Sequence, residues 1–425
     1  MSAPVSRRHI FAAVAGNALE FYDFTAYTFF AVQIGQAFFP LKTAFFSVLA
    51  SLVVFGVGFA GRPVGGVVLG IYADRYGRKP ALVLSFVLMG AGILALAVTP
   101  SYASIGMAAP ILVVIARIVQ GVALGGQVGP ATAYLLEAST PANRGLYTTL
   151  QFASQGLAAL MGGLASFLLA HYLSPDALAD YGWRIAFLIG AAVLPFGFFL
   201  QRALPETLAA ERGLVREPLR PHLRVAALGF VILASATIAV YTLYYLPTYA
   251  QTVLGLRASV AAASGMVFGA CNLVCSLASG WLSDRIGRKP VMIWARVVMV
   301  LVTVPLFVWL AAHNDGATLL VLTFVISVLA TFSAGAALVA IAENLPASLR
   351  SGTLGSIYAA AIAIFGGSAQ ALEQWLVGVT GSPLAPAWYL TAATALGVLA
   401  MMAMPESAPV KSGVSKSNVP KSSPS

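Results

Sequence analysis

The chain has 425 residues, of which 59% are hydrophobic and only 9% are charged, and its mean hydropathy is +0.88. A soluble domain carries about 25% charged residues, so this composition excludes a water-soluble globular protein and predicts an all-α protein of the lipid bilayer. The net charge of +10 is spread over short segments between apolar runs, which excludes nucleic acid as a partner.

Apolar runs of roughly twenty residues predict about twelve membrane-spanning helices joined by short loops. The first run follows Arg7 and Arg8 but contains Glu20 and Asp23, so it is interpreted as a span and not as a cleavable signal peptide. The predicted spans cover residues 10–35, 46–70, 80–99, 104–135, 145–171, 183–202, 224–250, 259–281, 290–311, 316–342, 352–378 and 385–404.

The longest polar break, residues 203–223, divides the chain into two predicted bundles of six helices, 1–202 and 224–404. Residues 405–425 form a tail rich in Ser, Lys and Pro that is expected to be disordered. Lys and Arg gather in alternate loops, so the positive-inside rule places both termini and the linker in the cytoplasm. The sequence thus predicts a multi-pass protein of the plasma (inner) membrane.

One charged cassette occurs twice, as GIYADRYGRKP (70–80) and GWLSDRIGRKP (280–290). Each copy joins the second and third predicted spans of its half. A second pair, EASTPANRG (137–145) and ENLPASLRSG (343–352), follows the fourth span of each half. Two pairs of repeats at equivalent positions indicate that the halves are related, which is typical of secondary transporters.

The cassettes are interpreted as latches that hold the two halves together at the cytoplasmic rim. The first glycine of each copy is expected to allow close helix approach, and the second to adopt backbone angles that other residues resist. The aspartate is expected to pair with an arginine of a neighbouring loop or with a helix N-terminus. The residues of the two latches are Gly70, Asp74, Arg75, Gly77, Arg78 and Lys79, and Gly280, Asp284, Arg285, Gly287, Arg288 and Lys289.

The cassette G-x-x-x-D-R-x-G-R-K resembles the loop signature of the major facilitator superfamily. The resemblance implies two six-helix bundles around a cavity that opens alternately to either side. GNALEFYDF (16–24), GRPVGG (61–66), ARIVQG (116–121) and YGWRIAF (181–187) are similar to the metabolite:proton symporter family. ENLPASLR (343–350) and IFGG (364–367) are similar to its citrate–proton symporter branch. The family implies inward transport of carboxylated metabolites with protons.

Ionisable residues within the predicted spans are candidate functional residues, because a charge in the membrane costs several kcal/mol unless it is paired or hydrated. Glu20, Asp23 and Tyr27 share one face of the first span. Arg117 in the fourth span is expected to bind a substrate carboxylate, with a structural pair to Glu20 or Asp23 as the alternative. Asp23 is slightly preferred over Glu20 as the proton carrier. Gln127 stands where the resembled family frequently has Glu, which leaves coupling to the first span.

Other residues in the spans complete the set of candidates. Further substrate contacts are predicted at Asn17, Tyr27, Gln120, Gln151, Gln155, Tyr241, Tyr245 and Asn272. An interfacial aromatic belt is the alternative for the tyrosines of span seven. Arg62 is expected in a structural pair, Arg296 to reach the cytoplasmic face, and Glu373 to lie near the outer rim.

The sequence predicts a proton-coupled symporter that imports an organic anion, with citrate or a related tricarboxylate favoured and sodium as the alternative coupling ion. A dicarboxylate, an aromatic acid or a betaine-like zwitterion are alternative cargoes. Export is less favoured because the fifth span lacks the Gly-Pro motif common in exporters of the resembled superfamily. The sequence has no HExxH, nucleophile elbow or phosphate-binding loop, so an enzyme is not expected. No cofactor or metal is predicted, and the protein is expected to be a monomer.

Overall fold

A computed structural model describes residues 7–76, 78–125, 144–195 and 220–407. At a few positions in these ranges, including Glu20, Asp74, Arg78 and Lys79, it describes the backbone alone. The predictions for those four side chains, for Gly77 and Gln127, and for most of the linker and the tail therefore fall outside the described residues.

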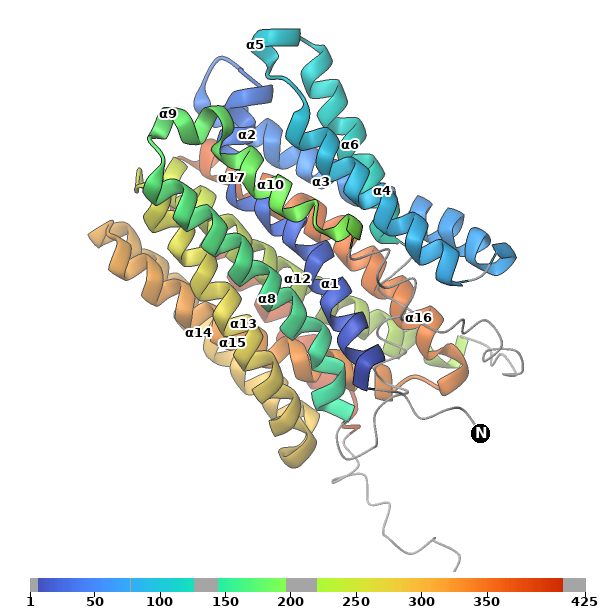
Figure 1. Ribbon diagram of the computed structural model, residues 1–425. Coiled ribbons are helices and arrows are strands. Elements are labelled where there is room, and N and C mark those ends of the chain that lie inside the picture. Colours follow the sequence, from blue (N-terminus) through green and yellow to red (C-terminus); the bar gives the residue numbers. More distant parts are fainter. Residues whose placement is uncertain (1–6, 77, 126–143, 196–219, 408–425) are drawn as a thin grey trace, which may run out of the picture.

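The described chain folds into helices (Figure 1). Those of the first half are α1 (Arg7–Phe29), α2 (Ala31–Phe38), α3 (Ala44–Tyr76), α4 (Arg78–Val98), α5 (Tyr102–Ile105), α6 (Ala108–Gly125), α8 (Arg144–Tyr172), α9 (Pro175–Ala177), the π-helix η1 (Leu178–Gly182) and α10 (Trp183–Gly190). Those of the second half are the 3-10 turn η2 (Arg220–His222), α12 (Leu223–Thr252), α13 (Ala258–Ile286), α14 (Arg288–His313), α15 (Gly316–Glu343), α16 (Ala347–Ala361), the π-helix η3 (Ile362–Gly366), α17 (Gly367–Thr380) and α18 (Ala385–Ala403).

Ten helices of the described chain are long and apolar enough to cross a membrane. They include two composite spans, Pro175–Pro195 through α9, η1 and α10, and Thr353–Thr380 through α16, η3 and α17. The other two predicted spans fall on α1 with α2, and on α4, whose apolar stretch Val83–Val98 is shorter. The described part of each predicted span therefore lies on a helix or a run of helices, and the ends of two spans, 126–135 and 196–202, fall outside the described residues. Helices are required here because lipid offers no partners for backbone polar groups.

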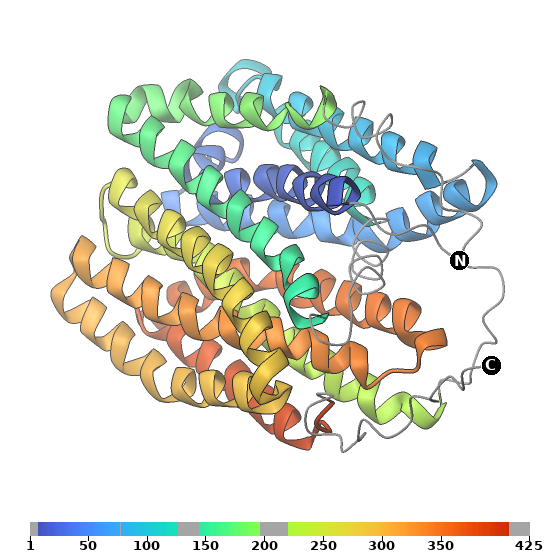
Figure 2. The same ribbon diagram turned by 60° about the horizontal axis from the view of Figure 1, so that its bottom comes forward.

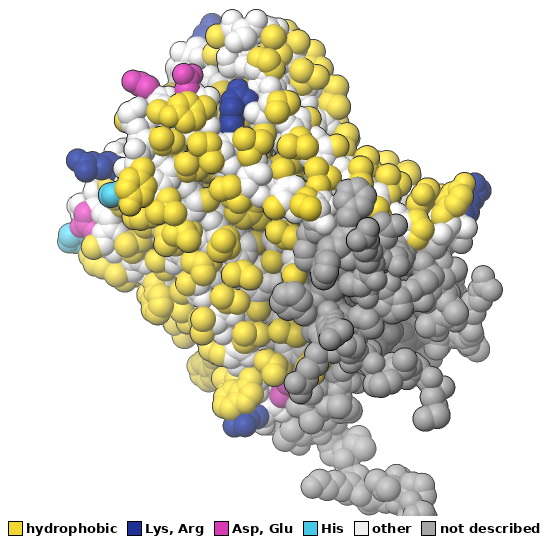
Figure 3. Space-filling model, in the orientation of Figure 1, with side chains coloured by type: hydrophobic (Ala, Val, Ile, Leu, Met, Phe, Trp, Pro, Cys, Tyr) yellow, Lys and Arg dark blue, Asp and Glu magenta, His cyan; other side chains and the backbone are white. Residues whose placement is uncertain are grey.

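The surface seen in Figure 3 is mainly apolar across its middle, and the charged side chains lie near its ends. In the turn between α14 and α15, Asn314 adopts a left-handed conformation at the end of α14, and the Asp315 carboxylate accepts the Thr318 N–H at 2.8 Å to begin α15. Polar residues thus end α14 and begin α15.

The two halves of the chain meet along α8 and α13, which lie side by side in Figures 1 and 2. Glycines allow this approach along most of the length of the two helices. A Cβ at Gly163 would lie 2.6 Å from the backbone nitrogen of Met266, and one at Gly280 would lie 2.7 Å from the carbonyl oxygen of Gly145. Small residues let helix backbones come close, which is how helices associate without a hydrophobic driving force in lipid.

Glycines also bring α3 against α6 within the first half. A Cβ at Gly61 would lie 2.7 Å from the carbonyl oxygen of Ile118, and one at Gly58 would lie 3.1 Å from that of Arg117. The glycines in and before the GRPVGG stretch therefore set the distance between the helix that carries Arg62 and the helix that carries Arg117.

One prediction about polar side chains is wrong in the structure, and one alternative is excluded. Arg296 does not reach the membrane surface: it is fully buried, and its Nε donates to Ser333 Oγ of α15 at 3.0 Å. The tyrosines of α12 form no interfacial belt, since Tyr241, Tyr244, Tyr245 and Tyr249 are all at most 4% exposed. Glu373, expected near the outer rim, is fully buried and contacts Thr242 of α12.

Candidate functional site

The centre of the site is a buried ion pair between α1 and α6. Arg117 is 4% exposed and Asp23 is 2% exposed. Arg117 Nη1 lies 3.4 Å from Asp23 Oδ2 but only 2.6 Å from Gln120 Oε1, one turn further along α6. Asp23 Oδ1 and Arg117 Nε have no hydrogen-bond partner within the described part of the chain. The carboxylate is thus loosely held, and the guanidinium retains donor capacity.

A small cavity opens beside this pair. Its volume is about 10 Å³, enough for about one water molecule and far too little for an organic acid. Of the described side chains, two guanidinium groups and one carboxylate line it. The lining residues are Asp23, Phe24, Gly58, Phe59, Arg62, Arg117, Gln120, Gly121 and Leu124.

Aromatic rings hold both guanidinium groups in place. The Arg117 Cζ lies 4.5 Å from the centroid of the Tyr27 ring, and the Tyr27 hydroxyl donates to the Ser51 carbonyl at 3.1 Å. Arg62 Cζ lies 4.2 Å from the Phe59 ring centroid. A guanidinium over a ring face is favourable and leaves its in-plane donors available, which suits recognition of a planar carboxylate.

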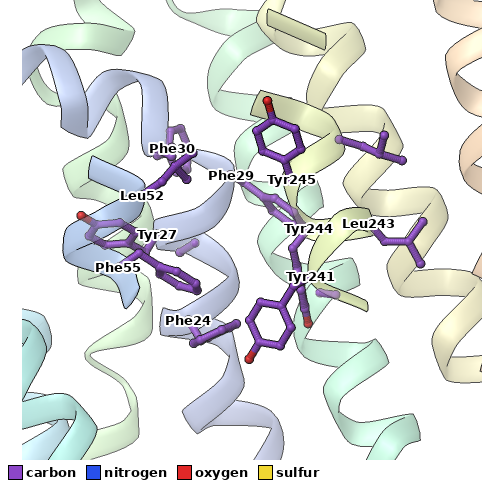
Figure 4. Packing of buried hydrophobic residues seen from close by; sticks show 14 of the residues in the cluster. Phe24, Tyr27, Phe29, Phe30, Leu52, Phe55, Tyr241, Leu243, Tyr244 and Tyr245 are labelled. Carbon is purple, nitrogen blue, oxygen red and sulfur yellow. The ribbon is translucent and has the colours of Figure 1, made fainter. Parts of the chain in front are cut away.

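An aromatic layer lies between the cavity and the second half of the chain. Phe24 of α1 and Phe59 of α3 pack against Tyr241 of α12, with each ring centroid 5.6 Å from that of Tyr241. Figure 4 shows Phe24 beside Tyr241. Tyr244 lies 5.8 Å from Phe24 by the same measure. The described halves are therefore in contact at the level of the ion pair, and widening the cavity requires these rings to separate.

The structure brings only some of the predicted substrate contacts to the cavity. Asp23, Arg117 and Gln120 line it, Tyr27 supports Arg117, and Tyr241 packs against its aromatic wall.

The other predicted substrate contacts lie elsewhere. Asn17 Nδ2 donates to Ser154 Oγ at 2.6 Å and joins α1 to α8, while the Tyr245 hydroxyl donates to Gln374 Oε1 at 2.6 Å. Gln151, Gln155 and Asn272 are buried on α8 and α13 and do not line this cavity.

Sequence reasoning placed Arg62 in a structural pair, and the structure adds this residue to the cavity wall. The signal was present in the GRPVGG stretch, which puts an arginine among glycines inside an apolar span. What the sequence lacked was the tight packing of α3 on α6 that turns Arg62 and Arg117 toward one cavity. Among the described residues, no group of three or more His, Cys, Asp or Glu forms a metal site.

The second cassette joins the two halves of the chain away from the cavity. The Asp284 carboxylate of α13 accepts the backbone N–H groups of Gly145 at 3.0 Å and Leu146 at 3.2 Å, at the N-terminus of α8. Arg288 Nη1 donates to the same carboxylate at 2.7 Å. The predicted pairing of this aspartate with a helix N-terminus is confirmed, whereas its arginine partner belongs to the same cassette and not to a neighbouring loop.

Arg288 also fixes the cassette to α15. Its Nε and Nη2 donate to the two carboxylate oxygens of Glu343 at 3.1 and 3.0 Å, a bidentate pair. Beside it, the backbone N–H groups of Arg288 and Lys289 donate to Glu406, which therefore caps α14. Arg285 instead stacks 3.8 Å from the Trp281 ring centroid. The glutamate of ENLPASLR and the arginine of the cassette thus form one cluster.

The glycines of the cassettes differ between the two copies. Gly287 has φ +106°, as predicted, and Gly280 packs closely against Gly145. The close approach expected at Gly70 is not seen among the described residues, none of which has an atom within 4 Å of a Cβ placed there. The corresponding part of α3 leaves its side chains exposed at Ile71, Arg75 and Tyr76. Within the described part of the chain, the first glycines of the two cassettes therefore differ in their packing.

Long apolar helices that bury an ion pair beside a small cavity are typical of a membrane carrier. The chain belongs to the Major Facilitator Superfamily, whose family model matches residues 13–278 and 261–424. This membership confirms the predicted fold class and a transport protein rather than an enzyme.

Proteins and structures of known description are similar to nearly the whole chain. A citrate-proton symporter of Salmonella typhi is 36% identical over 93% of this chain and 94% of its own length, and one of Klebsiella pneumoniae is 34% identical over 92% and 90%. An alpha-ketoglutarate permease of Escherichia coli (strain K12) is 32% identical over 91% of each chain. The crystal structure of a D-xylose-proton symporter superposes with a TM-score of 0.74 at 19% identity, covering 95% of this chain and 98% of that one.

Proposed function

We propose that the protein is a proton-coupled symporter that imports an organic anion, citrate or a related tricarboxylate, by alternating access. The observation that carries the proposal is the buried pair of Arg117 and Asp23, whose charged atoms lie 3.4 Å apart beside a cavity that Arg62 also lines. Guanidinium groups in a water-poor site favour an anion that carries carboxylates. The similarity to the two citrate-proton symporters supports the same cargo.

Arg117 is the proposed anchor of the substrate. Its guanidinium offers paired N–H donors to a carboxylate, and Tyr27 holds its plane in place. Arg62 supplies a second cation for a second carboxylate of the same molecule. Binding requires the aromatic layer of Phe24, Phe59 and Tyr241 to separate, because the cavity holds about 10 Å³ as it stands.

Asp23 is the proposed proton carrier at this site. Its distance of 3.4 Å to Arg117 is long for an ion pair, so a substrate carboxylate can replace it on the guanidinium. Without that partner a buried carboxylate would be left uncompensated, at a cost of several kcal/mol, and taking up a proton removes the cost. Substrate binding thereby favours proton binding, which couples the two fluxes.

The cassettes are proposed to latch the cytoplasmic ends of two six-helix bundles, residues 1–202 and 224–404. The bond network of Asp284 joins α13 to the N-terminus of α8 and would break when the cavity opens on that side. Both termini are proposed to be cytoplasmic, in the inner membrane, because the positive loops lie on this side. The protein is proposed to act as a monomer.

The test is uptake of labelled citrate into proteoliposomes with and without an inward proton gradient. Accumulation above the outside concentration only with the gradient is expected. Accumulation driven by a sodium gradient at equal pH would reject the coupling ion, and no flux of citrate by the inserted protein would reject the cargo.

A dicarboxylate is the second candidate cargo. It is supported by the similarity to the alpha-ketoglutarate permease and by the same two guanidinium groups, which suit a molecule with two carboxylates. Competition of unlabelled 2-oxoglutarate against labelled citrate distinguishes the two. Stronger inhibition by 2-oxoglutarate than by citrate itself would favour the dicarboxylate.

A further inference from the structure

Glu373 of α17 is a buried acid that the central site does not use. Its side chain is fully buried in the second half of the chain, while the ion pair of Asp23 and Arg117 lies in the first. No described cation forms an ion pair with it. An ionised carboxylate without a partner in such surroundings costs several kcal/mol, whereas the neutral acid costs far less. Burial alone therefore favours a protonated side chain.

The hydrogen bonds around Glu373 also indicate that its carboxyl group is protonated, because the number of available donor hydrogens is limited. Thr242 Oγ1 is within hydrogen-bond distance of both Glu373 Oε1 and the Ile238 carbonyl, the latter at 2.9 Å. A threonine hydroxyl has one hydrogen and cannot donate to both oxygens. If Glu373 carries a proton, its O–H donates to Thr242 Oγ1 and the Thr242 hydroxyl donates to Ile238. The protonated acid satisfies both contacts.

Among the described residues, no charged group around Glu373 would keep a proton off or on permanently. The nearby titratable groups are Tyr245 of α12 and Tyr389 of α18. On α3, the contacts Gly56 to Gly367 and Phe45 to Gly378 place Glu373 near the level of residue 50. Arg62 lies about 12 residues, or about 18 Å along the helix, toward the other end. The π-helix η3, IAIFG, contributes no titratable group.

Further polar atoms extend from Glu373 along the same buried region. Gln370 lies one turn before the neighbouring residues Glu373 and Gln374 on α17, and Gln374 Oε1 accepts the Tyr245 hydroxyl at 2.6 Å. Glu373 Oε2, Gln374 Nε2 and both side-chain polar atoms of Gln370 have no hydrogen-bond partner among the described residues. Buried groups with unused hydrogen-bonding capacity can exchange partners, which a group that gains and loses a proton requires.

The helices that hold Glu373 are placed to respond when the halves move. α12 carries Thr242 next to Tyr241, the tyrosine that packs against the wall of the central cavity. α17 meets α3 of the other half at Gly56, and it follows the π-helix η3. Pro247 interrupts the hydrogen bonds of α12 just beyond Tyr245. π-helical turns and prolines are recurrent sites of helix rearrangement.

We propose that Glu373 is a second proton-carrying carboxyl, separate from Asp23, which takes a proton from water on one side of the membrane and releases it to water on the other during each cycle. The inference rests on the proposed proton-coupled transport and adds a second proton to it. Movement of α12 against α17 would expose the acid to each side in turn.

The experiment measures the number of protons carried per substrate. With the membrane potential clamped to zero, each co-transported proton raises equilibrium accumulation about tenfold per unit of pH difference. Glu373→Gln keeps the shape and neutrality of the protonated acid. At a difference of one pH unit, this variant is expected to transport but to accumulate about tenfold less than the wild type. Asp176→Asn, an exposed acid of α9, is the control and is expected to match the wild type.

Equal accumulation by Glu373→Gln and the wild type would overturn the proposal, and so would dependence of accumulation on sodium at constant pH. Infrared difference spectra of the substrate-free protein between acid and alkaline pH give a second readout. A protonated-carboxyl band that is present in the wild type and absent from Glu373→Gln supports the proposal even if the variant does not transport. Identical spectra would overturn it. If the wild type fails to accumulate citrate, the proposed function fails, and the spectra still decide the state of Glu373.

Discussion

Gly280 and Gly70, the first glycine of each cassette, allow a matched test of the helix packing. An alanine Cβ at Gly280 would lie 2.7 Å from the carbonyl oxygen of Gly145, and it would also contact Thr149 Oγ1. Backbone atoms cannot easily retreat, so the helices α8 and α13 must separate at this end. Overpacking of this kind costs about 1–3 kcal/mol, and the better helix propensity of alanine returns up to about 1 kcal/mol.

The same substitution at Gly70 meets no atom within 4 Å among the described residues. Gly70→Ala should therefore gain only the helix propensity, up to about 1 kcal/mol. The two variants should differ by about 1–3 kcal/mol in stability, since only Gly280→Ala carries the steric cost.

The assay is thermal unfolding of the two variants and the wild type in one detergent at one scan rate, because membrane proteins often unfold irreversibly. Gly280→Ala is expected to unfold at a lower temperature than the wild type, and Gly70→Ala at the same or a higher temperature. Equal temperatures for both variants would refute the reasoning, since they would mean that the close approach of α8 and α13 at Gly280 is absent.

Three further predictions concern transport. Arg117→Lys should raise the apparent KM for citrate about 10- to 150-fold at equal membrane levels, which corresponds to the loss of about 1.5–3 kcal/mol for a charge-assisted bond. The control is Arg184→Lys, which also removes an arginine stacked on an aromatic ring. It should leave KM unchanged, because Arg184 donates to the carbonyls of Ala97 and Thr99. An unchanged KM in Arg117→Lys would contradict the anchor role. Asp23→Asn should retain exchange of citrate across the membrane but lose accumulation driven by a proton gradient, and accumulation at the wild-type level would move the coupling role elsewhere. Asp284→Asn should weaken the link to α8 by about 1.5–3 kcal/mol and change the turnover rate more than the affinity for citrate. The control is Asp315→Asn, which removes a helix cap within one half and should leave the turnover rate unchanged. Equal effects of the two substitutions on the turnover rate would argue against a latch.

The composition and the repeats of the sequence determined the class of the protein. Runs of apolar residues long enough to cross a bilayer leave few alternatives to helices, because an unpaired backbone group in lipid costs several kcal/mol. The duplicated cassette resembles the loop signature of the superfamily, and the match to the family model confirms the membership. Asp23 and Arg117 could be selected from sequence because a charge within an apolar span is costly and requires a reason.

Only the tertiary structure decided which of these polar residues meet. The sequence gives each residue a place along its helix but not the direction that neighbouring helices impose, so Arg62 enters the cavity, Asn17 and Tyr245 bind elsewhere, and Glu373 turns inward to α12. The difference between the two cassettes is also visible only in the structure, because Gly280 packs against α8 whereas Gly70 has no described neighbour. Packing depends on the small residues of two helices together, and a single sequence does not state which helices face each other.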